Sequence, residues 1–142
     1  MADSDGSDFA RSMSIATSGL RAQAGRMRVI SENIANADST APTAGGEPYR
    51  RKVPTFSSAL DRTLDAKVVT LGKVRADQSA FRVKHEPGNP AADGAGNVKY
   101  PNVNPLIEMT DMREAQRSYE ANVNVIGATR RMIQRTLDIL KA

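Results

Sequence analysis

The sequence predicts an α+β protein in which two long terminal helices pack as a coiled coil, with a small β-rich middle domain between them. Apolar residues recur at helical spacing at both ends of the chain, whereas the middle is rich in Pro, Gly and β-forming residues. Of the 142 residues 39% are hydrophobic but only 4% aromatic, and aromatic side chains supply much of the area that a core buries. We therefore expect long helices that bury their faces partly against other chains.

The N-terminal helix is predicted over residues 9–38, after a flexible extension at 1–8. Its Gly19 and Gly25 each cost about 1 kcal/mol relative to Ala in a helix interior. We expect residues 1–38 to be frayed in the free chain and to fold on assembly; the alternative is an ordinary hairpin of two helices. Apolar residues recur at steps of three and four, which predicts a heptad seam at Phe9, Met13, Ala16, Leu20, Met27, Ile30, Ile34 and Ala37.

The C-terminal helix is predicted over residues 105–142. Asn104 is a suitable N-cap, and Pro105 suits the first helical position. The same spacing continues to the end of the chain, and it predicts that the seam of this helix consists of Met112, Tyr119, Val123, Ile126, Ile133, Leu137 and Leu140.

Both helices carry a second apolar row, about 160° around the helix from the seam position that each heptad begins with. A hairpin of two helices buries one seam, and the chain offers no other large apolar element to cover a second one. We therefore expect this row to contact neighbouring subunits. It consists of Ile15 and Val29 in the first helix and of Val125, Met132 and Ile139 in the second.

The middle of the chain is predicted to contain a loop with a short helical connection at 39–66 and a small β domain at 67–104. The segment "SSALDRTL" is the expected helical stretch, and "KVVTLGKV" and "AFRVKHE" read as strands. In "EPGNP" we expect a turn with a positive φ at Gly88.

The sequence offers little chemistry for a catalytic, cofactor or metal site. It contains no Cys, and His85 is its only His, expected to be partly buried on a strand face with Phe81 and Val83. No zinc-ligand spacing, phosphate-binding loop or dinucleotide fingerprint is present. An acidic start without an apolar segment argues against a cleaved signal, and no apolar run is long enough to span a bilayer. We expect no enzyme.

A basic helical nucleic-acid-binding protein is the alternative. The formal net charge is +4, and basic residues cluster at 50–52 and at Arg130, Arg131 and Arg135. However, Glu120 and Asp138 interrupt the basic helix, and aromatic residues are scarce. A solvated helix face explains the charge more simply.

Two terminal segments resemble the shared regions of the bacterial flagellar rod and hook proteins. They are "SGLRAQAGRMRVISENIANADST", which runs from a helix into a loop, and "SYEANVNVI", which precedes a long helix. The block "HEPGNPAADGAGNVKYPNVNPLIEM" is similar to the proximal rod members of that family. The residues of the family motifs are Asn33, Asn36, Asn122 and Asn124. The acidic N-terminal extension and Arg130–Arg131 depart from the family pattern.

The resemblance implies a structural subunit of the proximal rod, the drive shaft of the flagellar basal body in the periplasm. Its terminal helices would form an inner coiled-coil domain. Its partners would be copies of itself, other rod proteins, base and ring components and the flagellar type III export apparatus, without nucleic acid or membrane insertion. We also expect Asn33 and Asn36 to bond to an adjacent subunit, with Asn122 and Asn124 as counterparts, because an amide can both donate and accept.

Overall fold

The computed structural model describes residues 2–142, with side chains from residue 6 onward, and divides into two compact units. The first contains the chain up to Arg26, Phe56–Gly72 and the chain from Glu114; the second contains Met27–Thr55 and Lys73–Arg113. Two helices, α1 (Ala2–Ala35) and α2 (Pro105–Lys141), each contribute to both units. The predicted α+β class is confirmed.

The strands form three separate two-stranded antiparallel sheets, β1–β4, β2–β3 and β5–β6. One β domain at 67–104 was predicted, but β2–β3 belongs to the first unit and the other two pairs to the second. The strands are β1 (Lys52–Val53), β2 (Phe56–Asp61), β3 (Ala66–Leu71), β4 (Arg75–Ala76), β5 (Arg82–His85) and β6 (Asn97–Tyr100).

The prediction of a short helix in "SSALDRTL" is wrong. Every residue of β2 pairs with one in β3, from Phe56↔Leu71 to Asp61↔Ala66. The β-branched run in β3 offers a strand partner, and this pairing overrides the weak local preference of the Ser and Ala residues for a helix. Asp61 then closes the hairpin, since its Oδ1 accepts the backbone N–H of Thr63 at 2.9 Å.

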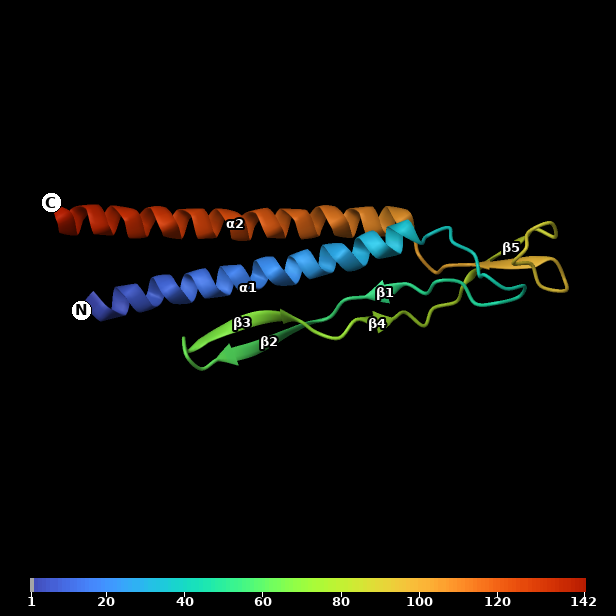
Figure 1. Cartoon of the computed structure of the whole chain (residues 1–142), viewed down its shortest axis with the longest axis horizontal. Helices are drawn as coiled ribbons and strands as arrows, with labels where there is room; N and C mark the ends of the chain where they lie inside the picture. Colours follow the sequence, from blue (N-terminus) through green and yellow to red (C-terminus); the bar gives the residue numbers. More distant parts are fainter. Residues whose placement is uncertain (1) are drawn as a thin grey trace. The chain divides into compact units, whose positions relative to one another are not determined.

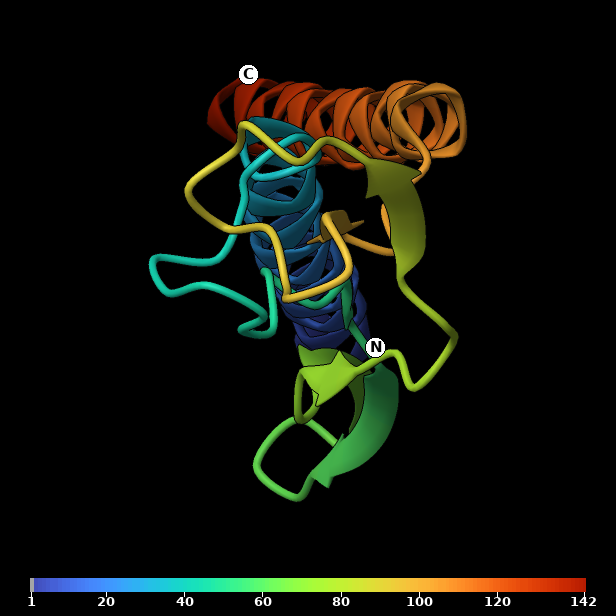
Figure 2. The ribbon, with the colours of Figure 1, turned by 90° about the vertical axis from the view of Figure 1, so that its right-hand side faces the viewer.

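In the first unit, α1 lies between α2 and the β2–β3 hairpin (Figures 1 and 2). The hairpin meets α1 through the outer edge of β3, where the Val69 N–H donates to Ser18 Oγ at 3.1 Å. At the turn, Arg11 Nε donates to the Leu64 carbonyl at 2.7 Å. This bond pairs one N–H of the outer edge of β3. The helix α1 therefore covers a strand edge that would otherwise be open.

The two helices of the first unit meet through small and polar residues. A Cβ atom added at Gly19 would lie 2.9 Å from Asn122 Nδ2, so α1 approaches α2 closely at this point. Ala115 and Thr129, each seven residues from Asn122, are buried. Within the predicted seam of α2, Val123, Leu137 and Leu140 are exposed, whereas Met112, Tyr119, Ile126 and Ile133 are half-buried. The heptad pattern was defined by large apolar residues, whereas the close approach of two helices requires small residues at their contact.

The bounds of α1 differ from the prediction at both ends, whereas α2 agrees with its predicted bounds to within one residue. α1 begins at Ala2 instead of Phe9, in a segment without proline into which an established helix extends at low cost. It ends at Ala35, and the following N–H of Ala37 donates to the Ile34 carbonyl at 3.2 Å. At the start of α2, Asn104 Oδ1 accepts the Leu106 N–H at 3.1 Å, so the predicted N-cap is confirmed.

The β5–β6 pair of the second unit has a small core made of Ala91, Val98 and Tyr100. Gly88 does not have the predicted positive φ; Gly96 does, at 79°. The reversal occurs there because Asp93 Oδ1 accepts the N–H groups of Ala95 and Asn97, each at 2.9 Å.

His85 is exposed and not partly buried as predicted, with its Nδ1 3.3 Å from Asn97 Oδ1. Val83 also lies on the surface of this exposed strand. All four residues of β5 are exposed, whereas Val98 and Tyr100 of its partner β6 are buried.

Candidate subunit interfaces

Asn33, the central residue of the family motif, is buried in the second unit with all its hydrogen bonds made. Its Nδ2 donates to Glu108 Oε2 at 3.0 Å and to the Lys52 carbonyl at 2.8 Å. Its Oδ1 accepts the Lys52 N–H at 2.9 Å and the Tyr49 hydroxyl at 2.8 Å. The Asn33 amide therefore connects the end of α1, the chain at the start of β1 and the first turns of α2. We call Asn33, Tyr49, Lys52 and Glu108 together the Asn33 joint.

Glu108 is buried as deeply as Asn33 and is paired with Arg51. Arg51 Nε donates to Glu108 Oε1 at 2.5 Å, and its other nitrogens lie 3.6 Å from Asp77 and 3.7 Å from Asp111. Burial opposes the charge of Arg51, but the hydrogen bond from its guanidinium to Glu108 and the three nearby carboxylates raise its pKa. The buried charge is therefore paired and hydrogen-bonded, which its burial requires.

The protonation of Tyr49 keeps the Asn33 joint intact at neutral pH. Burial, together with the charges of Glu32 and Glu108, raises the pKa of Tyr49 to about 12. The hydroxyl therefore keeps its proton and donates to Asn33. Lys52 Nζ also pairs with Glu32, which adds a second connection between α1 and this segment.

The structure places the other motif residues differently from the expectation. Asn33 cannot bond to an adjacent subunit because its partners lie in its own chain. Asn36 is half-buried, and its Nδ2 donates to the Glu32 carbonyl at 2.8 Å in the last turn of α1. Asn122 Nδ2 donates to the Ser118 carbonyl at 3.1 Å and faces Gly19, while Asn124 is exposed.

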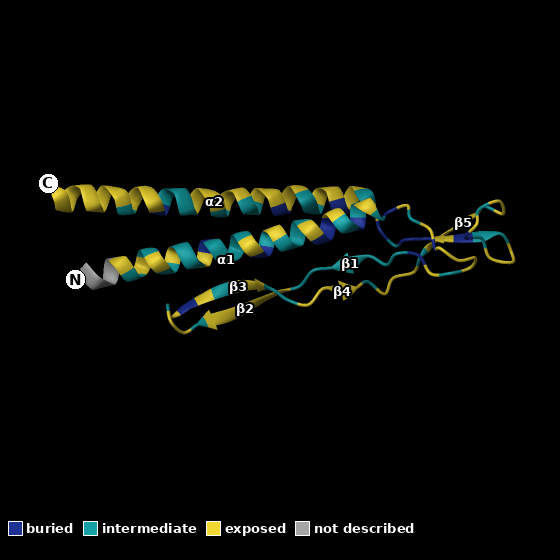
Figure 3. Cartoon of the chain, viewed as in Figure 1, coloured by how far each residue is buried: buried dark blue, intermediate teal, exposed yellow. Residues whose placement is uncertain are grey.

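Four of the five residues of the predicted second row are exposed, and Figure 3 shows exposed surface along α2. Their exposed fractions are 43% for Ile15, 45% for Val125, 49% for Met132 and 75% for Ile139. Val29, in contrast, is only 6% exposed. The row of α2 is thus available for another molecule, whereas Val29 belongs to the core of its own chain.

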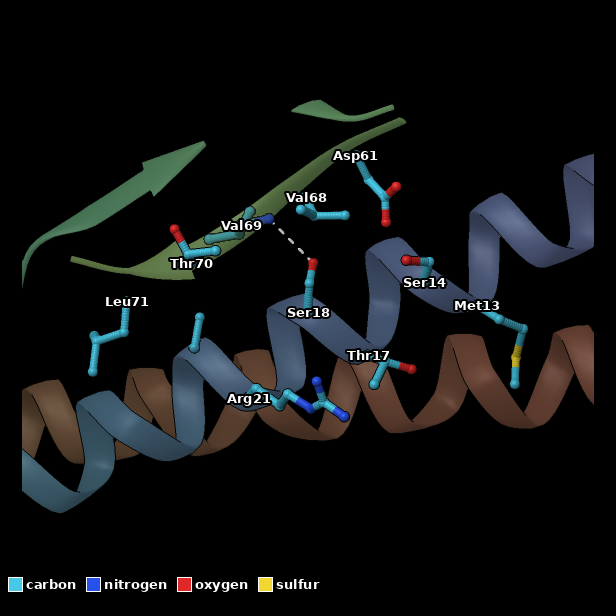
Figure 4. A pocket seen from close by; sticks show the side chains of 11 residues that line it. Met13, Ser14, Thr17, Ser18, Arg21, Asp61, Val68, Val69, Thr70 and Leu71 are labelled. Carbon is cyan, nitrogen blue, oxygen red and sulfur yellow. Dashed lines mark hydrogen bonds between the residues drawn. The ribbon is translucent and has the colours of Figure 1, made fainter. Parts of the chain in front are cut away.

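A groove of about 550 Å³ lies between α1 and the β2–β3 hairpin in the first unit (Figure 4). Arg21 and Thr17 project from α1, and Asp61 and Val69 come from the hairpin. Near its end, Leu71 packs over Gly25: a Cβ atom added at Gly25 would lie 2.6 Å from Leu71 Cδ2. The groove mixes hydroxyl, charged and apolar groups without a nucleophile and base in contact, so it is a surface feature of the packing.

Within residues 2–142 the structure shows no group of His, Cys, Asp and Glu side chains arranged to hold a metal ion. In the same part of the chain neither helix is apolar enough over its length to cross a membrane. Arg130, Arg131 and Arg135 are exposed, as a solvated helix face would have them.

The predicted rows missed a set of exposed apolar residues in the first turns of α2. Leu106, Ile107 and Met109 lie there, beside the acidic residues that surround Arg51. The letters "PLIEM" directly after the N-cap could have signalled it, because Met109 continues the seam spacing back from Val123 in steps of seven, whereas Leu106 and Ile107 fit neither row.

Comparison with known proteins gives two family matches. The family described as "Flagella basal body rod protein" matches residues 13–41. The one described as "Flagellar basal body rod FlgEFG protein C-terminal" matches residues 95–139. The first match includes Asn33 and the second includes Glu108, so the Asn33 joint draws on both matched segments.

Three curated relatives extend this similarity to most of the chain, and each is called flagellar basal-body rod protein FlgC. The protein of Agrobacterium fabrum is 55% identical over 128 residues, which cover 90% of this chain and 92% of the relative. That of Bacillus subtilis is 39% identical over 92% of this chain and 97% of its own length. That of Escherichia coli O157:H7 is 40% identical over 88% and 92%, respectively.

Proposed function

Because the chain belongs to the flagellar basal-body rod protein family, closest to FlgC, we propose that it forms the proximal part of the rod and transmits torque there. It is a structural protein of the basal body and acts by assembly with other rod and basal-body proteins. The observation that carries this conclusion is the identity of 55% over 90% of the chain.

The surface of the isolated chain supports an assembly role. The buried apolar residues are mostly Ala and Val, while larger residues such as Met132 and Ile139 are exposed. Monomeric proteins seldom expose apolar side chains in continuous rows, and such rows mark protein–protein contacts. The row of Val125, Met132 and Ile139 therefore contacts neighbouring subunits in the rod.

The neighbours include copies of this chain, other rod proteins and the base and ring components. The flagellar type III apparatus exports the chain, and its place is the periplasmic rod. The nucleic-acid alternative has no support in the described part of the structure or in the names of the relatives.

The experiment is complementation of a flagellated strain that lacks its own copy of the protein. The unchanged chain restores swimming, whereas Met132→Asp abolishes it and leaves secretion of the protein detectable. Gln134→Asp is the matched control, because Gln134 is exposed about 200° around α2 from Met132. Failure of the unchanged chain to restore swimming would reject the rod function. Normal swimming with Met132→Asp would reject the contact row alone.

A further inference from the structure

The first turns of α2 carry an apolar patch that neither predicted row contains. Its members are Leu106, Ile107 and Met109, with exposed fractions of 75%, 53% and 50%. We call it the first-turn patch. Leu106 lies between the other two around the helix, about 60° from Met109 and about 100° from Ile107, so a partner that covers Leu106 and its flanks removes apolar area from water and gains binding free energy.

The last turns of α2 carry a second patch. Leu137, Ile139 and Leu140 are 45%, 75% and 77% exposed, and Figure 3 shows this end of α2 as continuously exposed. We call it the last-turn patch. It cannot cover the first-turn patch of its own chain, because both belong to one continuous helix of 37 residues.

The charges beside the two patches have opposite sign. Asp77, Glu108 and Asp111 surround the single charge of Arg51 beside the first-turn patch. A polar cavity of about 190 Å³ opens there, lined by Ile107 of the patch and by Asp77, Asn102 and Asn104, among others. Beside the last-turn patch, Arg135 and Lys141 outnumber Asp138. Complementary charge favours the docking of one patch on the other and disfavours contact of either patch with itself.

We propose that the last-turn patch of one copy docks on the first-turn patch of a second copy, with Lys141 beside the carboxylates around Arg51. The inference deepens the proposed function and rests on it. The two surfaces are different, so the contact is heterologous and repeats without closing, as a rod requires.

Cysteine cross-linking tests the contact cleanly, because the chain contains no Cys of its own. Leu106→Cys and Leu140→Cys copies, distinguished by mass, are mixed and oxidised, both in solution and in basal bodies of cells that express both. We expect a disulfide-linked heterodimer. Gln116→Cys replaces Leu140→Cys in the control mixture, since Gln116 is also an exposed residue of α2. The heterodimer of the control should be at least about five-fold less abundant, which exceeds the effect of a weak surface contact.

A charge test accompanies the cross-link. Lys141→Glu in the Leu140→Cys copy should lower the yield about two- to five-fold, the range of an exposed ion pair, and Lys141→Arg should preserve it. Equal yields with Gln116→Cys, or disulfides that join Leu140→Cys copies mainly to each other, would overturn the inference. So would cross-linking in basal bodies only to a different rod protein. Cells that swim without the predicted cross-link would leave the rod function standing and reject this contact.

Discussion

At the scale of single residues, Asn33 and Glu108 show what a motif can and cannot reveal. The sequence marked Asn33 as important but suggested a bond to another subunit. Its actual partners, Tyr49, Lys52 and Glu108, lie 16 to 75 residues away along the chain. Hydrogen bonds over such separations leave no periodic trace in a sequence. Only the fold could show that the amide joins three segments of its own chain.

Replacing Asn33 by Leu should lower the free energy of unfolding by about 2–4 kcal/mol, because buried polar partners lose their hydrogen bonds. Urea denaturation measures the change. Asn36→Ala is the control, since the Asn36 side chain, directly after α1, makes one local bond to the Glu32 carbonyl, and it should cost less than about 1 kcal/mol. A midpoint for Asn33→Leu equal to that of the unchanged chain would contradict the role of the Asn33 joint.

The turn around Glu86 should loosen in acid. Hydrogen bonds from Asn89 and from the Tyr100 hydroxyl lower the pKa of Glu86 below its ordinary value of 4.5. Its stabilising contribution is therefore present above about pH 4.5 and is lost as the pH falls through the lower, folded value. Amide exchange of residues 92–100 between about pH 6 and pH 3 measures this, after correction for intrinsic rates. Glu86→Gln should flatten the dependence; an unchanged profile in that variant would refute the assignment.

At the scale of elements, the two helices and β3 could be predicted from local patterns, but their faces could not. Helix existence follows from spacing, whereas the face that α2 turns to α1 depends on Gly19 and on the small residues Ala115 and Thr129. Strand β2 was missed because its residues have no clear preference for strand over helix. It becomes a strand only by pairing with β3. Likewise Gly96, not Gly88, takes the positive φ because Asp93 organises that turn.

Gly96→Ala should destabilise the second unit by about 1–2 kcal/mol. An alanine at positive φ is strained, and its Cβ would lie 2.9 Å from His85 Cε1. Gly94→Ala is the matched control in the same turn, because no atom lies within 4 Å of its added Cβ. It should be neutral or slightly stabilising. Thermal denaturation of both variants measures the difference, and equal melting temperatures would show that the left-handed conformation at Gly96 is not required.

The expectation that α1 is the weaker helix stays a prediction. Gly19 and Gly25 lower its intrinsic stability, while both also allow close packing against Asn122 and Leu71. In hydrogen exchange on the free chain, amides of residues 9–35 should exchange at least about ten-fold faster than those of 108–133, and should become protected on assembly. Equal protection of both helices in the free chain would show that α1 folds without its neighbours.

At the scale of the whole molecule, the shortage of core material was predictable from composition. Few aromatic residues and two apolar rows per helix indicated a chain completed by other chains. The structure adds which surface is already used: Val29 is buried, while Met132 is exposed. The contribution of the β2–β3 hairpin in covering α1 could not be foreseen, because the hairpin itself was not predicted.

Val29→Asp and Met132→Asp should therefore both impair assembly, but only Val29→Asp should do so by destabilising the free chain. A charge at the buried site of Val29 should destabilise the free chain by about 3 kcal/mol or more, whereas the exposed Met132 site should tolerate it within about 0.5 kcal/mol. Circular dichroism during urea unfolding distinguishes them. If both variants unfold alike, Val29 is not part of the internal packing that the structure describes.

The contact of Leu71 with Gly25 has a mechanical consequence. Gly25 leaves a notch in α1, and the residues one turn away, Arg21 and Val29, fill the surface with side chains. The contact between Leu71 and Gly25 therefore fixes the position of the β2–β3 hairpin along the axis of α1. Sliding under load would force Leu71 out of its notch before the next position is reached. In a rod built from such subunits, each subunit would resist sliding of its hairpin along α1, whatever the strength of the contacts between neighbouring subunits.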